Sequence, residues 1–341
     1  MNDAEGFDMQ ELEWDAGRGV WLAAGAALVE QVLEHPGLRV RPPAEAVPLA
    51  LAGGSAGEVF GALVRMNDGE RHAAPRLALQ RALAAFAQPA APPASASMAQ
   101  QRARLVAGRL LAQGCSYRAW TFDAPVSTVA SLLGFADAQL PAVARWMGDF
   151  VACLSPLSSA AQIAAAHAAS LRLLAAMRAL LQAAPAGSLA AAVAQEAQAA
   201  GWRNDHAILA NLVGLLSQTY EATAGLLGNC LVALQQGADR VDAAQLVAQV
   251  MRSDPPIVNT RRFAAERCTV GGVTVEAGQA ILVMLGAAQR GFGHGRHACP
   301  GQQLARQLAA GCIEALGSAP LPQLTWTYRA SLNARLPEFE Q

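Results

Sequence analysis

A short stretch near the end of the chain gathers the residue types that could hold a metal-containing cofactor. Residues 292–301 read F-G-H-G-R-H-A-C-P-G and lead into a predicted helix over residues 302–316, and Cys299 is the chemical centre of the stretch. A thiolate binds metal best where hydrogen-bond donors surround the sulfur and a following helix favours negative charge. His297 and Arg296 add positive charge for nearby carboxylates. The backbone can approach a flat cofactor closely at three glycines, which are Gly293, Gly295 and Gly301.

This combination suits a haem that is held by a cysteine thiolate. The stretch resembles the haem-binding loop of the cytochrome P450 family, F-G-x-G-x-H-x-C-x-G, at every fixed position. The resemblance implies that Cys299 is the axial ligand of haem b and that other loop residues contact the cofactor, namely Phe292, Gly293, His297 and Gly301. The alternative, a structural cysteine buried in a glycine-rich turn, requires a chance match of many residue types at once.

Two further elements are similar to family elements that bind the carboxylates of haem, its propionates. Residues 65–76 contain an H-x-x-x-R pattern, and the resemblance carries the two propionate-binding roles to His72 and Arg76. Pro75 lies inside this spacing and is compatible with a helix only if it falls in the first turn. Arg262 matches another propionate-binding arginine of the family. The alternatives are a solvated histidine at a helix start and an ordinary strand arginine.

A predicted long helix contains the run L-L-S-Q-T-Y-E-A-T-A-G-L-L-G-N, which resembles the oxygen-activating helix of the family, A-G-x-E/D-T. Glu221 falls on the acid, but Ala222 falls where the threonine belongs, and Gln218 and Thr219 replace a pair of small residues. Gln218 and Ala222 are four residues apart and therefore share the face toward the haem. Thr223 is one step round the helix and can act only if the helix bulges locally.

The candidate catalytic residues are therefore Gln218, Glu221, Ala222 and Thr223. Because Ala222 offers no hydroxyl to relay protons, we expect weak conventional oxygen activation, with Gln218 crowding the iron. The alternative is that Gln218 caps a neighbouring carbonyl and that Glu221 faces solvent.

The opposite, proximal side of the predicted haem site also departs from the family. Residues 241–254 resemble the family's E-x-x-R helix, with Arg252 present but Gln249 in place of the glutamate. The family normally has a long irregular segment, often called the meander, before the cysteine loop, and this segment is missing after Arg290. A buried glutamate without its partners is costly, whereas a glutamine needs only hydrogen bonds, so we expect the two losses to be coupled. Arg252 should then bind backbone carbonyls or Asp254. The bared proximal face should be covered by a second copy of the chain or by an unusual partner.

The elements that must position these residues are mostly helices. Apolar spacing predicts helices over residues 26–33, 98–113, 125–133, 140–154, 160–181, 188–199, 204–235 and 241–254, and a helix that ends near residue 86. Short strands are expected over residues 20–24, 38–40, 260–264 and 280–285, with a hairpin at residues 271–278, and irregular connections over residues 41–62 and 87–97. We predict one mainly α domain over residues 1–341, and the resemblance implies the cytochrome P450 fold with small β-sheets.

Composition excludes several classes of function. The 25 basic and 26 acidic residues give a net charge of -1, so nothing suggests a nucleic-acid partner. Every basic residue is arginine, which excludes a Schiff-base lysine and a P-loop lysine. The six cysteines lack C-x-x-C pairs and indicate a reducing compartment. With no secretory leader and no charge-free apolar segment of spanning length, we expect a cytoplasmic protein without a membrane partner.

The resemblance implies a haem-thiolate oxidoreductase that adds oxygen to a small organic substrate, a monooxygenase, with a ferredoxin or flavodoxin-type electron donor. Two other functions remain open from the sequence. One is an unconventional haem-thiolate enzyme that uses peroxide or performs dehydration or nitrogen chemistry, which the departures at Gln218 and Ala222 favour. The other is a degenerate module that binds haem or a partner without turnover, which the loss of several family residues suggests.

Overall fold

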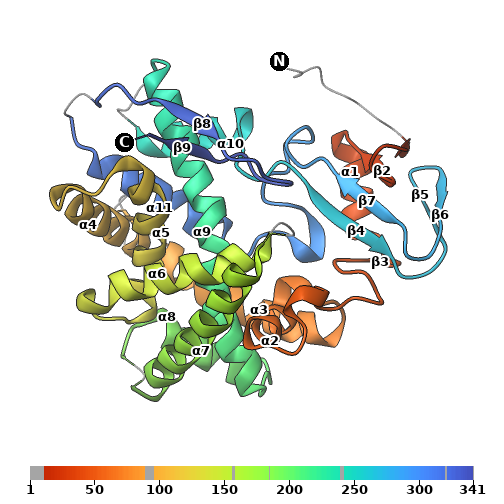
Figure 1. Ribbon diagram of the computed structural model, residues 1–341, viewed down its shortest axis with the longest axis horizontal. Coiled ribbons are helices and arrows are strands. Elements are labelled where there is room, and N and C mark those ends of the chain that lie inside the picture. The colour runs from red at the N-terminus through yellow and green to blue at the C-terminus, as the bar shows by residue number, and fades with distance from the viewer. Residues whose placement is uncertain are drawn as a thin grey trace.

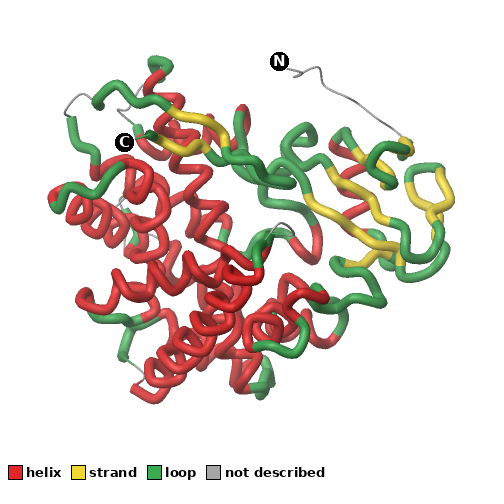
Figure 2. The backbone as a smooth tube through the Cα atoms, viewed as in Figure 1, coloured by secondary structure: helices red, strands yellow, loops and turns green. Residues whose placement is uncertain are grey.

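The computed structural model describes residues 11–88, 96–155, 158–183, 185–238, 242–318 and 321–340. Helices dominate it (Figures 1 and 2). The α-helices are α1 (Ala26–Glu34), α2 (Ser55–Ala62), α3 (Glu70–Ala87), α4 (Met98–Ala112), α5 (Tyr117–Leu133), α6 (Leu140–Val151), α7 (Ala160–Ala183), α8 (Leu189–Ala199), α9 (Asp205–Gln235), α10 (Ala243–Ser253) and α11 (Gln302–Ala315). Short 3-10 helices are η1 (Leu49–Leu51), η2 (Val64–Met66), η3 (Asp137–Gln139), η4 (Ala152–Leu154) and η5 (Gly295–His297).

The strands form one mixed sheet and two hairpins. The sheet has the order β1-β2-β7-β4-β3, with β1 (Glu13–Asp15), β2 (Val20–Ala23), β7 (Ala280–Val283), β4 (Thr260–Ala264) and β3 (Leu38–Arg39). β2 and β7 are parallel, and Trp21 lies opposite Ile281. The hairpins are β5 (Cys268–Val270) with β6 (Val273–Val275) and β8 (Trp326–Tyr328) with β9 (Pro337–Phe339). The sheet therefore joins the start of the chain to the segment that precedes the cysteine loop.

The fold class is confirmed as mainly α with small sheets. The predicted long helix is α9, which begins where the Asn204 side chain accepts a hydrogen bond from the Ala207 amide. α5 begins earlier than predicted, at Tyr117, because Ser116 caps it by accepting from the Ala119 amide. Pro125 is thus inside the helix and not at its start.

The prediction of an irregular connection over residues 41–62 is wrong in its last part, which forms α2. Glycines favoured a loop there, but Gly57 instead allows close packing, since a Cβ atom on it would lie 2.1 Å from the carbonyl oxygen of Leu51. α2 packs against α7 and α9. Tertiary packing therefore overrides the local preference for a loop. Most of the predicted connection over residues 87–97, and part of the linker before α10, lie outside the described residues.

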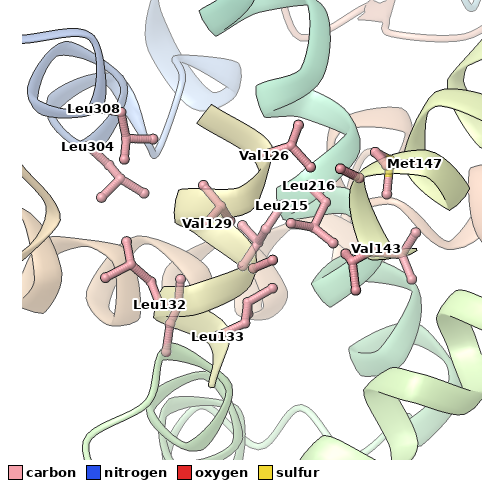
Figure 3. Packing of buried hydrophobic residues seen from close by; sticks show 14 of the residues in the cluster. Val126, Val129, Leu132, Leu133, Val143, Met147, Leu215, Leu216, Leu304 and Leu308 are labelled. Carbon is pink, nitrogen blue, oxygen red and sulfur yellow. The ribbon is translucent and has the colours of Figure 1, made fainter. Parts of the chain in front are cut away.

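The main apolar core surrounds α9, which runs through the helical part of the molecule (Figure 1). Figure 3 shows side chains of α5, α6, α9 and α11 meeting in this core, among them Val129, Met147, Leu216 and Leu308. A second apolar cluster lies between α1 and the mixed sheet. The cysteine loop connects the strand β7 of this second cluster to the helix α11 of the first.

Among the described helices, α7 is the one whose length and apolar composition match a membrane span, with a mean hydropathy of 1.3. One such helix is weak evidence, because core helices of water-soluble proteins pass the same test. α7 carries buried side chains such as Leu173 and Met177 and packs against α2, α6 and α9. Its apolar face therefore already has a place in the helical core.

Candidate haem-binding site

The cysteine loop is a compact turn whose backbone holds Cys299 at the start of α11. The Cys299 amide donates to the carbonyl of Phe292 at 2.8 Å, which closes the loop. Burial raises the pKa of the Cys299 thiol, while the Gly301 amide, as a hydrogen-bond donor to the sulfur, and the charge of Arg76 act in the opposite direction. The environment therefore supplies donors for a sulfur anion but leaves the free thiol protonated. A metal ion as the sulfur's partner would favour the thiolate.

Two of the three loop glycines have a backbone conformation that other residues rarely adopt. Gly293 has φ of 73° and Gly295 has φ of 63°, and a Cβ atom on Gly295 would lie 2.9 Å from Cγ of Glu34. Gly301 has an ordinary φ of -100°, and a Cβ atom there would meet only Leu83, at 3.8 Å. Chain geometry thus requires glycine at Gly293 and Gly295, whereas nothing in the chain itself requires it at Gly301.

The loop is fastened to α1 and β3 from the start of the chain. The guanidinium of Arg296 donates to the carbonyls of Glu34, His35 and Leu38 at 2.9–3.1 Å. Backbone oxygens thus occupy the two terminal nitrogens of Arg296, while its Nε atom lies 3.8 Å from Asp68 Oδ1, so the residue does place positive charge beside a carboxylate. Arg290 pairs with Glu30 at 2.5 Å and reinforces the same attachment.

The predicted propionate-binding residues His72, Arg76 and Arg262 come together with His297. The rings of His72 and His297 are 4.1 Å apart, and His297 Nε2 lies 2.9 Å from Asp68 Oδ1. Arg76 donates to the carbonyl of Ala298 at 2.6 Å, next to Cys299. Burial lowers the pKa of Arg262 to about 10, and Asp68 and Arg296 are the charges that act on it.

Three nitrogen atoms in this group are buried and lack a hydrogen-bond partner within the described part of the chain, which are His72 Nε2, Arg76 Nε and Arg262 Nε. Buried donors are normally satisfied, because an unpaired polar group costs free energy. Burial also lowers the pKa of His72 to about 4. An acceptor with negative charge beside Cys299 would satisfy all three. The residues therefore fit a flat cofactor that carries carboxylates.

Pro75 lies deeper in its helix than predicted. α3 begins at Glu70, so Pro75 is its sixth residue and lies beyond the first turn. A proline there cannot donate to the carbonyl of Arg71. α3 nevertheless continues through this position, and His72 and Arg76 both remain helical. His72 and Arg76 therefore lie near the start of a helix, as predicted. The expectation that Pro75 must fall in the first turn of that helix is wrong.

On the other side of the site, α9 is continuous and presents a short unburied segment. Gln218 is exposed and residues 219–222 are half-buried, although residues 211–217 and 223–232 are buried. This segment is therefore the accessible stretch in the middle of the otherwise buried helix. Thr223 is buried and α9 shows no local bulge, so Thr223 does not replace the hydroxyl that is missing at Ala222.

Two side chains of this segment, Gln218 and Glu221, have partners within the protein. The Gln218 amide donates to the carbonyl of Gly214 at 2.9 Å, so the alternative of a carbonyl cap is the one the structure shows. Glu221 lies 3.5 Å from Arg329, and burial raises its pKa. Glu221 is thus part of an ion pair, not a free carboxylate in solvent.

Curated relatives and solved structures resemble this chain. Cytochrome P450 107B1 of Saccharopolyspora erythraea is 25% identical over 225 residues, which is 56% of this chain and 55% of the relative. The mycinamicin IV hydroxylase/epoxidase of Micromonospora griseorubida is 28% identical over 216 residues, 53% of each chain. These matches support the assignment of the chain to the cytochrome P450 family. No family model matches the chain.

The crystal structure of CalO2 superimposes on this P450 with a TM-score of 0.76 and 21% identity, and covers 96% of this chain and 91% of its own. This likeness concerns the fold. The chain spans about half the length of the curated relatives described above. The family's cofactor is haem, and the cysteine loop with its unpaired donors is the part of this P450 suited to hold it.

The proximal side of this P450 differs from the sequence-based prediction. Gln249 and Arg252 are both exposed on α10, so the premise of a buried network is wrong. Asp254 is the partner of Arg335, at 2.6 Å, and not of Arg252. The chain passes directly from β7 to the cysteine loop through a tight turn in which Gln289 has φ of 54°.

Two further arginines, Arg41 and Arg65, have no role in the sequence-based predictions. Both have a buried Nε atom without a partner in the described residues. Burial lowers the pKa of Arg65 to about 10, with Arg41 and Glu221 as the charges that act on it. No motif marks these positions. Arg65 lies five residues before the start of α3 at Glu70 and seven before His72.

Proposed function

We propose that this P450 is an enzyme that holds haem b through Cys299 within one domain over residues 1–341. His72, Arg76, Arg262 and His297 would bind the haem carboxylates. The observation that carries the proposal is the group of unpaired buried nitrogens at His72, Arg76 and Arg262 beside the cysteine loop. Their desolvation is unfavourable unless an anionic partner satisfies them. Phe292, Gly293 and Gly301 would complete the loop side of the site.

When bound, a thiolate-ligated haem supplies the iron centre at which dioxygen or peroxide is activated. The protein's own part is to hold and insulate that centre. The Gly301 amide donates to the sulfur, and Arg76 adds a positive charge beside it. On the opposite side, the segment of α9 around Gln218 and Ala222 borders the space where a substrate would bind.

The reaction proposed first is monooxygenation of a small organic molecule, with electrons from a ferredoxin or flavodoxin-type donor. The similarity to cytochrome P450 enzymes, one of which is a hydroxylase/epoxidase, supports it. We place the enzyme in the cytoplasm, in keeping with its free cysteines, of which Cys230 and Cys312 are fully buried. We also propose that a second copy of the chain covers the proximal face, from which the meander is missing.

A second function, peroxide-driven or otherwise unconventional haem-thiolate chemistry, is favoured by one specific observation. Ala222 lies on the open face without a hydroxyl, and the nearby Thr223 is buried. A positioned general acid contributes about 10²- to 10⁴-fold in rate, so its absence weakens a reaction that requires delivered protons. Glu221 is held by Arg329 and does not supply a free carboxyl group.

The test combines a carbon monoxide difference spectrum with turnover assays on the full chain. A thiolate-type spectrum followed by oxidation with a reductase pair supports monooxygenation. Oxidation with hydrogen peroxide alone supports the second function. A thiolate-type spectrum with neither turnover supports the binding module, and the absence of haem binding rejects the proposal.

A further inference from the structure

Arg65 is a cation inside the protein that no described group neutralises directly. It lies in η2, and neither a hydrogen bond nor an ion pair within 4.0 Å joins its guanidinium to any described residue. A guanidinium stays charged near pH 7 even with a pKa of about 10. The Nε atom of Arg65 is buried, yet the residue keeps intermediate exposure, so part of its side chain remains accessible to a ligand. A charge in this position needs a partner.

The backbone that carries Arg65 is fixed to α9, so the side chain is presented by a rigid segment. The buried Asn211 on α9 accepts from the Val64 amide at 2.9 Å and donates to the carbonyl of Ala62 at 2.9 Å. One turn along α9, a Cβ atom on Gly214 would lie 2.7 Å from Leu63. Asn67 donates to the carbonyl of Leu63 and closes the turn from the other side, at 2.7 Å. Pre-organisation of this kind lowers the cost of binding a ligand.

Arg65 is separate from the group that fits the haem carboxylates. The charges that act on Arg262 are Asp68 and Arg296, whereas those that act on Arg65 are Arg41 and Glu221. Glu221 lies on the unburied segment of α9, and its cation within ion-pair distance is Arg329, at 3.5 Å. The segment that carries Arg65 is fastened to α9 at Asn211 and Gly214, one turn before the accessible stretch at residues 218–222, so we assign Arg65 to the substrate side of the site.

Arg41 makes the substrate side of the site more electropositive. Its guanidinium lies 5.0 Å from the ring centroid of Phe60 and donates to the carbonyl of Glu45, but its Nε atom has no partner in the described residues. The positive charge of Arg41 contributes to the lowered pKa of Arg65, so the two cations repel each other. An anion between them would remove the repulsion and satisfy both Nε atoms.

We propose that Arg65, supported by Arg41, binds the carboxylate of an organic acid, so that this enzyme prefers substrates that carry a carboxylate. A planar guanidinium fork matches a carboxylate with two parallel hydrogen bonds. The negative charge of Glu221 nearby disfavours a dianion such as a phosphate monoester. The proposal rests on the proposed oxidative function, because it names the substrate class of that same site.

The test compares acids with the alcohols of the same carbon skeleton. Decanoate and decanol, and phenylpropionate and phenylpropanol, are titrated into the haem-loaded full chain, with binding followed by the shift of the haem absorption and by calorimetry. The wild type should bind the acid of at least one pair more tightly than its alcohol. Arg65→Met should weaken the acid by about 10- to 150-fold and leave the alcohol unchanged, since a hydrogen bond to a charged group contributes that much. Arg252→Met, at an exposed arginine on α10, is the matched control and should change neither.

Several results would overturn the proposal. They are the absence of any acid preference in the wild type, an acid preference that survives Arg65→Met, or an equal loss for acid and alcohol. If Arg65→Met does not load haem, Arg41→Met takes its place, and an unchanged acid preference in that variant also rejects the proposal. Calorimetry needs no turnover, so an intact acid preference in a protein without a thiolate-type spectrum rejects the proposed function and leaves the carboxylate site standing.

Discussion

The two sides of the haem-binding site show different degrees of agreement with the family. On the side of the cysteine loop, every fixed residue of the family pattern is present, and the backbone closes around Cys299 through the Phe292 carbonyl. On the side of α9, the acid Glu221 is tied to Arg329, and the relay position is occupied by Ala222. The difference supports the proposal that this chain binds haem as the family does but activates oxygen by other means.

The comparison also separates the tasks of the chain's arginines. Arg76 and Arg262 lie with the cysteine loop, whereas Arg41 and Arg65 lie with the altered side. Each side therefore holds arginines whose buried Nε atoms have no partner among the described residues. Substitutions on each side should consequently produce different kinds of loss.

The largest effect is expected from Cys299→Ser, on the side of the cysteine loop. A serine hydroxyl is a poor ligand in place of a thiolate, so the thiolate-type carbon monoxide difference band should disappear completely. The absorption spectrum of the reduced protein with carbon monoxide measures this. Cys268→Ser, at a half-buried cysteine on β5, should keep the band. An unchanged band in Cys299→Ser would show that the cysteine loop is not the ligand.

The next largest effect is expected on the altered side, from Ala222→Thr. The added hydroxyl restores a proton donor on the open face of α9, and a general acid is worth about 10²-fold or more in rate. We expect coupled, reductase-driven oxidation to rise by about tenfold or more. Product formed per NADPH consumed is the measurement. Ala222→Val adds similar bulk without a hydroxyl and should give no gain. Tight coupling in the unmodified protein would remove the contrast between the two sides.

A smaller effect is expected from Arg262→Met, which removes one cation from the side of the cysteine loop. The lost charged hydrogen bond should weaken haem binding by about 10- to 150-fold. Transfer of haem to an excess of an acceptor protein measures the affinity. Arg261→Met is the matched control, because Arg261 is the exposed neighbour on the same strand, and it should change nothing. Equal losses in both variants would mean that strand β4 and not the charge is responsible.

The smallest effect is expected from Gln249→Glu. Sequence reasoning predicts destabilisation, because it places this residue in a buried network without partners. The exposed position on α10 removes that reason, and a surface substitution changes the free energy of unfolding by less than about 0.5 kcal/mol. Thermal unfolding of the haem-loaded protein measures it. A loss of several degrees in melting temperature would restore the coupled-loss account.

Local sequence signals made the fold and the cysteine-loop side of the site predictable. The cap at Asn204, the apolar spacing of α9 and the letters of the cysteine loop each act over a few residues, and each led to the correct element. The misses have long-range causes. Gly57 is helical because it packs on Leu51, and Gln249 is exposed because α10 turns that face outward. Arg65 acquires its meaning from the distant Glu221 and Arg41, which no local pattern connects to it.

The attachment of the cysteine loop to the start of the chain has a consequence for biosynthesis. Arg296 binds the carbonyl of Glu34 across a separation of 262 residues, and strand β7 pairs with β2. At about 5–20 residues per second, a ribosome needs roughly 10 to 50 s to extend the chain across that gap. During this time the segment with β2 and Glu34 lacks its contacts with β7 and the cysteine loop. The candidate haem-binding site cannot form before these contacts do. Haem can therefore be inserted at this site only after the segment around Cys299 has been synthesised and has met the segment around Glu34.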